Sequence, residues 1–184
     1  FIMKRRIKHV TVLGSGIMGS GIAAHFANIG VEVLLLDIVP FELTEAEQKK
    51  GLTKEDKAVR NRIATESLAK LVKASPALLY KKEFAERISV GNFDDDLQKI
   101  KNTDWIIEMV VERLDIKKSV YEKIEQFRKP GTLVSSNTSG IPINMLVEGR
   151  SDDFKKYFAG THFFNPVRYL PLLEIIPTND TDAE

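Results

Sequence analysis

Three glycines with the spacing G-x-G-x-x-G follow a short run of β-branched and aliphatic residues near the start of the chain. The run is Val10–Leu13, and the glycines are Gly14, Gly16 and Gly19. A helical pattern comes next, and then a second buried strand that ends at Asp37. This order of strand, turn, helix and strand, with an acid at its far end, predicts a Rossmann-like unit that binds a dinucleotide.

Each glycine has a separate physical role in such a unit. Gly14 permits the tight turn out of the strand, Gly16 lets the backbone approach a pyrophosphate, and Gly19 lets helix and strand pack closely. The helix N-terminus offers unpaired N–H groups and a partial positive charge, and both suit phosphate. Ile17 and Met18 lie between these glycines. We therefore include both in the predicted cofactor site.

Asp37 indicates which dinucleotide is preferred. It lies 18 residues after Gly19, where a carboxylate can accept hydrogen bonds from the ribose hydroxyls. The same carboxylate repels a 2′-phosphate, and the next residues, Ile38 and Val39, supply no arginine to bind one. The sequence therefore predicts NAD rather than NADP. The alternative is that the glycines only serve packing in another kind of α/β protein and that Asp37 merely ends a strand.

Bulk composition excludes several classes of function. A chain of 184 residues can form one domain with a sizeable core. Its net charge of +1 gives no electrostatic reason to expect a nucleic-acid or membrane partner. The absence of cysteine excludes disulfides and thiolate chemistry, and it fits a reducing compartment, so we expect a cytoplasmic protein. No apolar run approaches the roughly 20 residues that a membrane span needs.

Strands and helices alternate along the rest of the chain. Residues 42–74 predict a long amphipathic helix, inserted after the second strand, and a further helix is expected at 116–127. Apolar runs expected to be strands lie at 88–90, 105–110, 132–135, 157–164 and 169–176. The acidic run 94–96 is more simply a solvated loop and helix cap than a metal site, so we predict no metal. The alternation predicts an α/β fold with a doubly wound, mostly parallel sheet.

Ligands of such sheets bind outside the carboxyl ends of the strands. Several polar or glycine-rich positions fall at or just past predicted strand ends: Gly14–Gly19, Asp37, Val111–Glu112, Ser136–Ser139 and His162. We expect them to share one rim.

NAD, the predicted cofactor, transfers hydride. An alcohol that gives up a hydride must also lose a proton, so the protein should supply a base. Of the three histidines, His9 precedes the first strand and His25 lies on the first helix. His162 lies at a strand end among aromatic residues, and the next apolar run carries Glu174. A glutamate buried there is costly unless a neighbouring histidine satisfies it, and its carboxylate would then orient the imidazole. The alternative is a surface glutamate and a packing histidine.

Two more polar side chains are candidates. Ser139, on a rim loop, could bond a substrate oxygen, although serine-rich turns are commonly only turns. Lys117 lies at the margin of the apolar face of its helix, where it either reaches over the rim to anionic ligand groups or snorkels to the surface.

These motifs resemble the N-terminal NAD-binding domain of the L-3-hydroxyacyl-CoA dehydrogenases of fatty-acid β-oxidation. The resemblance runs from about Ile7 to Thr178. The motifs that carry it are 14–19, 110–112 with Lys117, 136–139, and His162–Pro166 with Leu173–Glu174. The stretch 167–177 is most similar to the large bacterial proteins that join this dehydrogenase to an enoyl-CoA hydratase.

The resemblance implies oxidation of an L-3-hydroxyacyl-CoA to the 3-ketoacyl-CoA, with NAD as hydride acceptor. It implies His162 as general base, Glu174 as its partner, and Ser139 as a hydrogen-bond partner of the substrate 3-hydroxyl. The residues it places around NAD, besides the glycine-rich turn, are Met18, Asp37, Val111, Glu112, Lys117, Ser139 and Asn165. Ser67 and Lys73, on the long helix, are candidates for contacts with CoA.

We expect residues 1–178 to form the NAD-binding domain and 179–184 to begin a linker. In the family a helical C-terminal domain follows, which covers the active site and dimerises; a hydratase domain is a further candidate partner. We therefore expect this chain to be a fragment that binds NAD but turns over acyl-CoA weakly or not at all, because half of the substrate site and the water-excluding lid are missing. The alternatives are another β-hydroxyacid dehydrogenase with a lysine base, and a non-catalytic nucleotide-binding or structural relative.

Overall fold

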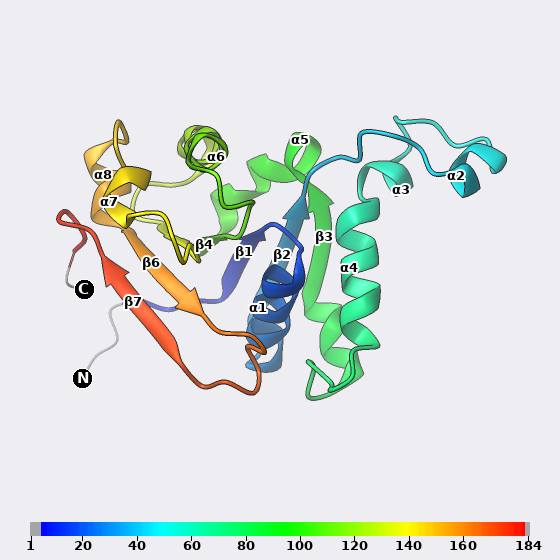
Figure 1. Cartoon of the computed structure of the whole chain (residues 1–184), viewed down its shortest axis with the longest axis horizontal. Coiled ribbons are helices and arrows are strands. Elements are labelled where there is room, and N and C mark those ends of the chain that lie inside the picture. Colours follow the sequence, from blue (N-terminus) through cyan, green and yellow to red (C-terminus); the bar gives the residue numbers. More distant parts are fainter. Residues whose placement is uncertain (1–4, 183–184) are drawn as a thin grey trace.

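The computed structural model describes residues 5–182, which form a seven-stranded sheet with helices on both faces (Figure 1). The strands are β1 (His9–Leu13), β2 (Glu32–Asp37), β3 (Ile88–Asn92), β4 (Trp105–Glu108), β5 (Leu133–Ser136), β6 (Phe158–Phe163) and β7 (Leu173–Pro177). Their order is β3-β2-β1-β4-β5-β6-β7. The first six are parallel, and β7 is antiparallel to β6. The predicted doubly wound, mostly parallel α/β fold is confirmed.

The central strands are apolar at nearly every position because both of their faces are covered. On one face lie α1 (Ile17–Asn28), α4 (Arg62–Val72) and the 3-10 helix η1 (Lys82–Arg87); on the other lie η2 (Leu97–Asn102), α6 (Leu114–Phe127), α7 (Ile143–Leu146) and α8 (Asp152–Lys156). Val12 and Leu35 pack into the hydrophobic core on the α1 side of the sheet, whereas their neighbours Leu13 and Leu36 pack into the core on the α6 side. Figure 1 shows α1 and α4 grouped on one side and α6, α7 and α8 on the other.

The insertion after β2 is confirmed, but the single long helix predicted for it is wrong. It contains α2 (Glu45–Lys49), α3 (Lys57–Arg60) and α4, and α2 lies at the tip of an arm beyond the sheet (Figure 1). The chain turns at Gly51, whose φ of +70° is accessible mainly to glycine. Two residues later the Thr53 N–H donates to the Asp56 carboxylate (2.7 Å), which ends the turn before α3. Local capping therefore overrides the apolar periodicity.

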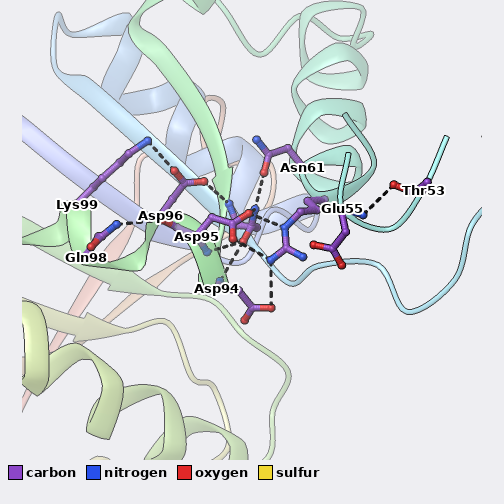
Figure 2. A network of polar contacts seen from close by, with 10 residues as sticks. Thr53, Glu55, Asn61, Asp94, Asp95, Asp96, Gln98 and Lys99 are labelled. Atoms are coloured by element: carbon purple, nitrogen blue, oxygen red, sulfur yellow. Dashed lines mark hydrogen bonds and ion pairs between the residues drawn. The ribbon is translucent and has the colours of Figure 1, made fainter. Parts of the chain in front are cut away.

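The arm is attached to the edge of the sheet through α5 (Phe93–Asp96). Arg60 donates two hydrogen bonds to Asp95, of 2.6 and 2.8 Å, and the Asn92 amide bonds both Asn61 and Asp95 (Figure 2). The Asn92 side chain also caps the helix by accepting from the Asp94 and Asp95 N–H groups. The acidic run is thus a helix start engaged in ion pairs. No group of three or more His, Cys, Asp or Glu side chains within residues 5–182 is placed to hold a metal ion.

The strand order reverses direction between β1 and β4. From β1 the chain builds outward to β2 and β3, and then crosses over to build β4 to β7 on the other side. The carboxyl ends of β1 and β4 therefore flank a crevice, which is where open α/β sheets bind their ligands. No helix of residues 5–182 has both the length and the apolarity to cross a bilayer.

Candidate cofactor and catalytic site

The glycine-rich turn joins β1 to α1, and its three glycines differ in what surrounds them. Gly14 has φ +110°, and a Cβ there would lie 2.7 Å from the Met109 carbonyl oxygen. A Cβ on Gly19 would lie only 1.9 Å from the Gly14 carbonyl oxygen. A Cβ on Gly16 would meet no atom within 4 Å. The fold itself therefore needs Gly14 and Gly19, whereas the space at Gly16 is open to a ligand.

Helix α1 begins beside this space without a side-chain cap. Gly16 occupies the N-cap position, and the first helical hydrogen bond runs from the Ser20 N–H to the Gly16 carbonyl. Ile17 is 79% exposed, and Met18 packs partly against the core. Uncapped N–H groups at a helix start, next to a glycine with no side chain, fit a pyrophosphate.

A cleft of about 670 Å³ opens over the carboxyl ends of the central strands. This volume lies within the ordinary range for small-molecule and cofactor sites. Its lining includes Gly14, Gly16, Asp37, Phe41, Met109, Val110, Val111, Ile116 and Val120. The lining is largely apolar, and its polar side chains are Asp37 at the end of β2 and Asp115, Ser119 and Lys123 on α6 (Leu114–Phe127). An apolar cleft with a carboxylate at the end of β2 suits an adenosine group held by its ribose.

Asp37 is already hydrogen-bonded within the protein. One carboxylate oxygen accepts from both the N–H and the hydroxyl of Ser15, each at 2.6 Å, and the other accepts from the Ile38 N–H at 2.7 Å. The Ser15 hydroxyl also lies 3.0 Å from that of Ser67 on α4. The carboxylate is therefore fixed at the cleft, next to the glycine-rich turn.

Lys117, in α6, is buried, so the snorkelling alternative is wrong. Its side chain is 2% exposed, and its ammonium lies 2.7 Å from Glu108 and 3.3 Å from Glu112. Burial alone would raise the pKa of Glu112, but hydrogen bonds from Thr138 and Gly140 and the charge of Lys117 outweigh it and hold that pKa below its usual value. Burial next to Glu108 raises the pKa of Tyr121 well above its usual value, so this phenol stays neutral.

The turn after β5 carries Ser139, which is exposed at the rim as predicted. The Ser139 N–H donates to Glu112 (3.2 Å), so the carboxylate of Glu112 bridges two neighbouring strand ends. On the other side, the Asn137 side chain accepts from the Phe163 N–H at 2.7 Å. The turn is therefore tied to the ends of both β4 and β6.

His162 and Glu174 face each other across the antiparallel pair β6–β7. The imidazole Nδ1 lies 2.8 Å from a Glu174 carboxylate oxygen, and the Phe164 ring packs 4.5 Å from the imidazole, centre to centre. The His162 side chain is 21% exposed and that of Glu174 is 52% exposed. The contact is the predicted one, but the reason given for it was wrong, because Glu174 is not buried.

The remaining predicted residues lie on loops that follow strand ends or on α4 and its C-terminal end. Val111 (60% exposed) and Asn165 are both on the surface of loops that follow strand ends. Ser67 lines a second cleft, of about 310 Å³, together with Gly16 and Lys70, and Lys73 is exposed at the end of α4. His9 lies near Asp104, and His25 packs edge-on against Phe163; partial burial lowers the pKa of His25.

Three residues that hold the site together were missed by the sequence reasoning: Ser15, Glu108 and Asn137. Ser15 and Asn137 lie inside recognised motifs, but nothing in their residue type marks the contacts they make. Glu108 did carry a signal, because it is the one charged residue of an otherwise apolar strand. An acid in that position has to find partners, and here it is fully buried.

The chain matches a known protein family over nearly its whole length. Residues 9–184 match the family described as 3-hydroxyacyl-CoA dehydrogenase, NAD binding domain. The chain belongs to this family. It is thus an NAD-binding domain, as the glycine-rich turn and Asp37 predicted.

Individual relatives agree with this assignment. A probable 3-hydroxyacyl-CoA dehydrogenase of Bacillus subtilis is 56% identical over 182 residues, which cover 99% of this chain and 23% of the relative. A putative fatty acid oxidation complex trifunctional enzyme of Rickettsia felis is 40% identical, over 95% of this chain and 22% of the relative. The crystal structure of (S)-3-hydroxybutyryl-CoA dehydrogenase from Ralstonia eutropha superposes with a TM-score of 0.70 at 30% identity and covers 97% of this chain and 56% of that one. The domain thus spans about a quarter to a half of the length of these relatives.

Proposed function

We propose that the protein oxidises an L-3-hydroxyacyl-CoA to the 3-ketoacyl-CoA with NAD as hydride acceptor, and that His162 is the general base. The observation that carries the proposal is the 2.8 Å contact between His162 Nδ1 and Glu174 at the rim that also holds the glycine-rich turn. Relatives named 3-hydroxyacyl-CoA dehydrogenase supply the substrate class.

The contact gives His162 the properties of a base. The Glu174 carboxylate accepts a hydrogen bond from the imidazole Nδ1–H, so the neutral ring carries its lone pair on Nε2. No protein group among residues 5–182 hydrogen-bonds to Nε2. This nitrogen takes the proton of the 3-hydroxyl, and the carboxylate stabilises the imidazolium that results.

The other residues bind and orient. In the proposed complex, Gly16 and the first turn of α1 hold the pyrophosphate and Asp37 the adenosine ribose. NAD held by these groups would supply the acceptor for the hydride that leaves the substrate C3 carbon. Ser139 donates to the substrate oxygen from the turn beside β6, and Ser67 and Lys73 are the proposed contacts with CoA. Asn165 and Val111 contribute loop surface around the cofactor.

Lysine is a poor candidate for the base in this domain. Lys117, the buried lysine of the site, already directs its ammonium at three protein acceptors: Glu108, Glu112 and the Val110 carbonyl. A general base must instead face the substrate hydroxyl. The β-hydroxyacid dehydrogenase alternative therefore has little support in the structure.

We further propose that this domain works with a helical domain that covers the rim, in a protein of cytoplasmic fatty-acid β-oxidation. Several large apolar side chains on and before β7 are 38–69% exposed: Leu170, Leu172, Leu173, Ile175 and Ile176. With Glu174 half exposed, water reaches the His162 pair from this side. We expect residues 1–184 alone to bind NAD but to turn over slowly.

The test uses the full-length protein with (S)-3-hydroxybutyryl-CoA and NAD, and follows NADH absorbance. We expect turnover with NAD, and a fall in kcat of at least about 10³-fold in His162→Gln, within the range that general-base catalysis supplies together with orientation. NADH affinity, measured by calorimetric titration, should stay unchanged in this variant.

Two results would contradict the proposal. Turnover of His162→Gln within tenfold of the unmodified protein would remove the histidine from the mechanism. A full-length protein that binds NADH but neither oxidises the hydroxyacyl-CoA nor reduces acetoacetyl-CoA would instead support the non-catalytic alternative.

A further inference from the structure

Glu108, the last residue of β4, is a buried charged group that the proposed mechanism does not use. Its side chain is 0% exposed. One oxygen accepts from the Lys117 ammonium (2.7 Å) and the Val110 N–H (2.8 Å); the other accepts from the hydroxyls of Tyr121 and Ser136, both at 2.7 Å. Four donors, from the loop after β4, from α6 and from β5, therefore hold one carboxylate. A buried group with this many partners has a single defined position.

The first route from Glu108 to the site runs through Lys117. The three N–H donors of an ammonium group face three protein acceptors here: Glu108, the Val110 carbonyl at 3.3 Å and Glu112 at 3.3 Å. The position of Lys117 is therefore set by Glu108 beneath it. In turn, Lys117 holds one of the two carboxylate oxygens of Glu112.

The other oxygen of Glu112 holds the turn that carries Ser139. It accepts from the Thr138 hydroxyl, the Ser139 N–H (3.2 Å) and the Gly140 N–H (3.1 Å). Three consecutive residues of the turn are thus fixed by one carboxylate. A charge-assisted acceptor shared by three donors restricts a loop that would otherwise be free at the rim.

A second route reaches the same turn through Ser136. Its hydroxyl donates to Glu108 and accepts from the Thr138 N–H at 3.2 Å. Both routes begin at Glu108 and end at residues 138–140. Neither passes through a group exposed to the cleft before it reaches Glu112 or the turn itself.

We propose that Glu108 is a positioning residue that fixes the turn of Ser139 from within the buried interior. It acts through Lys117 and Glu112 along the first route and through Ser136 along the second. It touches neither substrate nor cofactor. The role given to Ser139 rests on the proposed function, whereas the mechanical link from Glu108 to the turn does not.

The test compares two variants of the full-length protein. Glu108→Gln keeps the shape of the side chain and removes its charge, so it loosens both routes. The matched control is Thr11→Val in β1. It deletes an equally buried hydroxyl, which lies 2.6 Å from the hydroxyl of Thr103. Lys117→Met is a second variant that breaks only the first route.

Hydrogen–deuterium exchange of a peptide spanning 137–142 measures the link directly. We expect this peptide to exchange about tenfold faster in Glu108→Gln than in Thr11→Val at equal global stability, and Lys117→Met to follow Glu108→Gln. In turnover, kcat of Glu108→Gln should fall by about 10- to 100-fold, as expected when a group next to the substrate is misplaced by a fraction of an ångström.

The proposal is wrong if exchange at 137–142 and kcat in Glu108→Gln match those of Thr11→Val, because Glu108 then only stabilises the fold. The exchange measurement needs no turnover. Failure of the unmodified protein to oxidise the hydroxyacyl-CoA would therefore refute the proposed function and leave the positioning link standing.

Discussion

Substituting alanine for Gly16 and for Gly19 should separate cofactor binding from folding. A Cβ at Gly19 would lie 1.9 Å from the Gly14 carbonyl oxygen, where Cβ contacts below 3.0 Å are essentially never seen. The first turn of α1 and the glycine-rich turn must then move apart by about 1 Å. Both partners are backbone in a close-packed region, so no side chain can rotate away. We expect Gly19→Ala to lower the free energy of unfolding by about 3 kcal/mol or more.

Gly16→Ala should weaken NADH binding but leave the free energy of unfolding nearly unchanged. No atom lies within 4 Å of the added methyl group, and the φ of −59° is accessible to alanine. The free energy of unfolding should therefore change by less than about 1 kcal/mol. The methyl group would nevertheless occupy the space left open above the N-terminus of α1. If a pyrophosphate lies there, NADH affinity should fall at least about tenfold, or 1.4 kcal/mol.

Urea unfolding followed by tryptophan fluorescence and calorimetric titration with NADH measure the two quantities separately. Trp105, the only tryptophan, lies in β4 and reports on the sheet. The reasoning is refuted if Gly16→Ala binds NADH as tightly as the unmodified protein, because the open space would then not be the phosphate site. Equal destabilisation by the two substitutions would refute the assignment of Gly19 to packing.

Two further predictions concern carboxylates. Asp37→Asn removes the charge that disfavours a 2′-phosphate, so the ratio of the Kd for NADPH to that for NADH should fall about tenfold or more in calorimetric titrations; an unchanged ratio would contradict the role of Asp37. The Arg60 and Asn92 hydrogen bonds lower the pKa of Asp95 from 3.8 to about 2. The stabilisation of the folded protein by the Asp95 carboxylate is complete above pH 4 and is lost as the pH falls through about 2. Because Asp95 is largely exposed, Asp95→Asn should lower the free energy of unfolding by at most about 1 kcal/mol. This difference should shrink between pH 4 and 2 in urea unfolding.

The sheet and the cofactor turn could be predicted from the sequence because their signals are local. A strand before Gly14, a helix that starts at Ile17 and an acid at Asp37 constrain the backbone within 30 residues, and glycine roles follow from sterics alone. The insertion was harder. Its apolar spacing suggested one helix, yet Gly51 and the Thr53–Asp56 turn divide it, and these short-range polar contacts are invisible to a periodicity argument.

The candidate site was only partly predictable, because its polar contacts join distant segments. Glu108 meets Lys117, Tyr121 and Ser136, and the sequence does not say which of these an acid at a strand end will find. Lys117 was placed at the margin of a helix face, but whether a margin is buried depends on the neighbouring strand end. These contacts require the sheet order, which follows from the packing of the whole domain.

The antiparallel direction of β7 explains how Glu174, which is close to His162 in the sequence, can contact the imidazole without being buried. A parallel strand beside β6 would begin at the opposite edge of the sheet and would need a crossover of a dozen or more residues. Because β7 is antiparallel, its first residues lie at the rim, and the loop 164–172 suffices. Directly paired residues project from the same face, so the register of His162 with Glu174 brings carboxylate and imidazole together. A slip of one residue would turn Glu174 to the opposite face. The strand register, rather than the cost of burying a charge, therefore determines this contact.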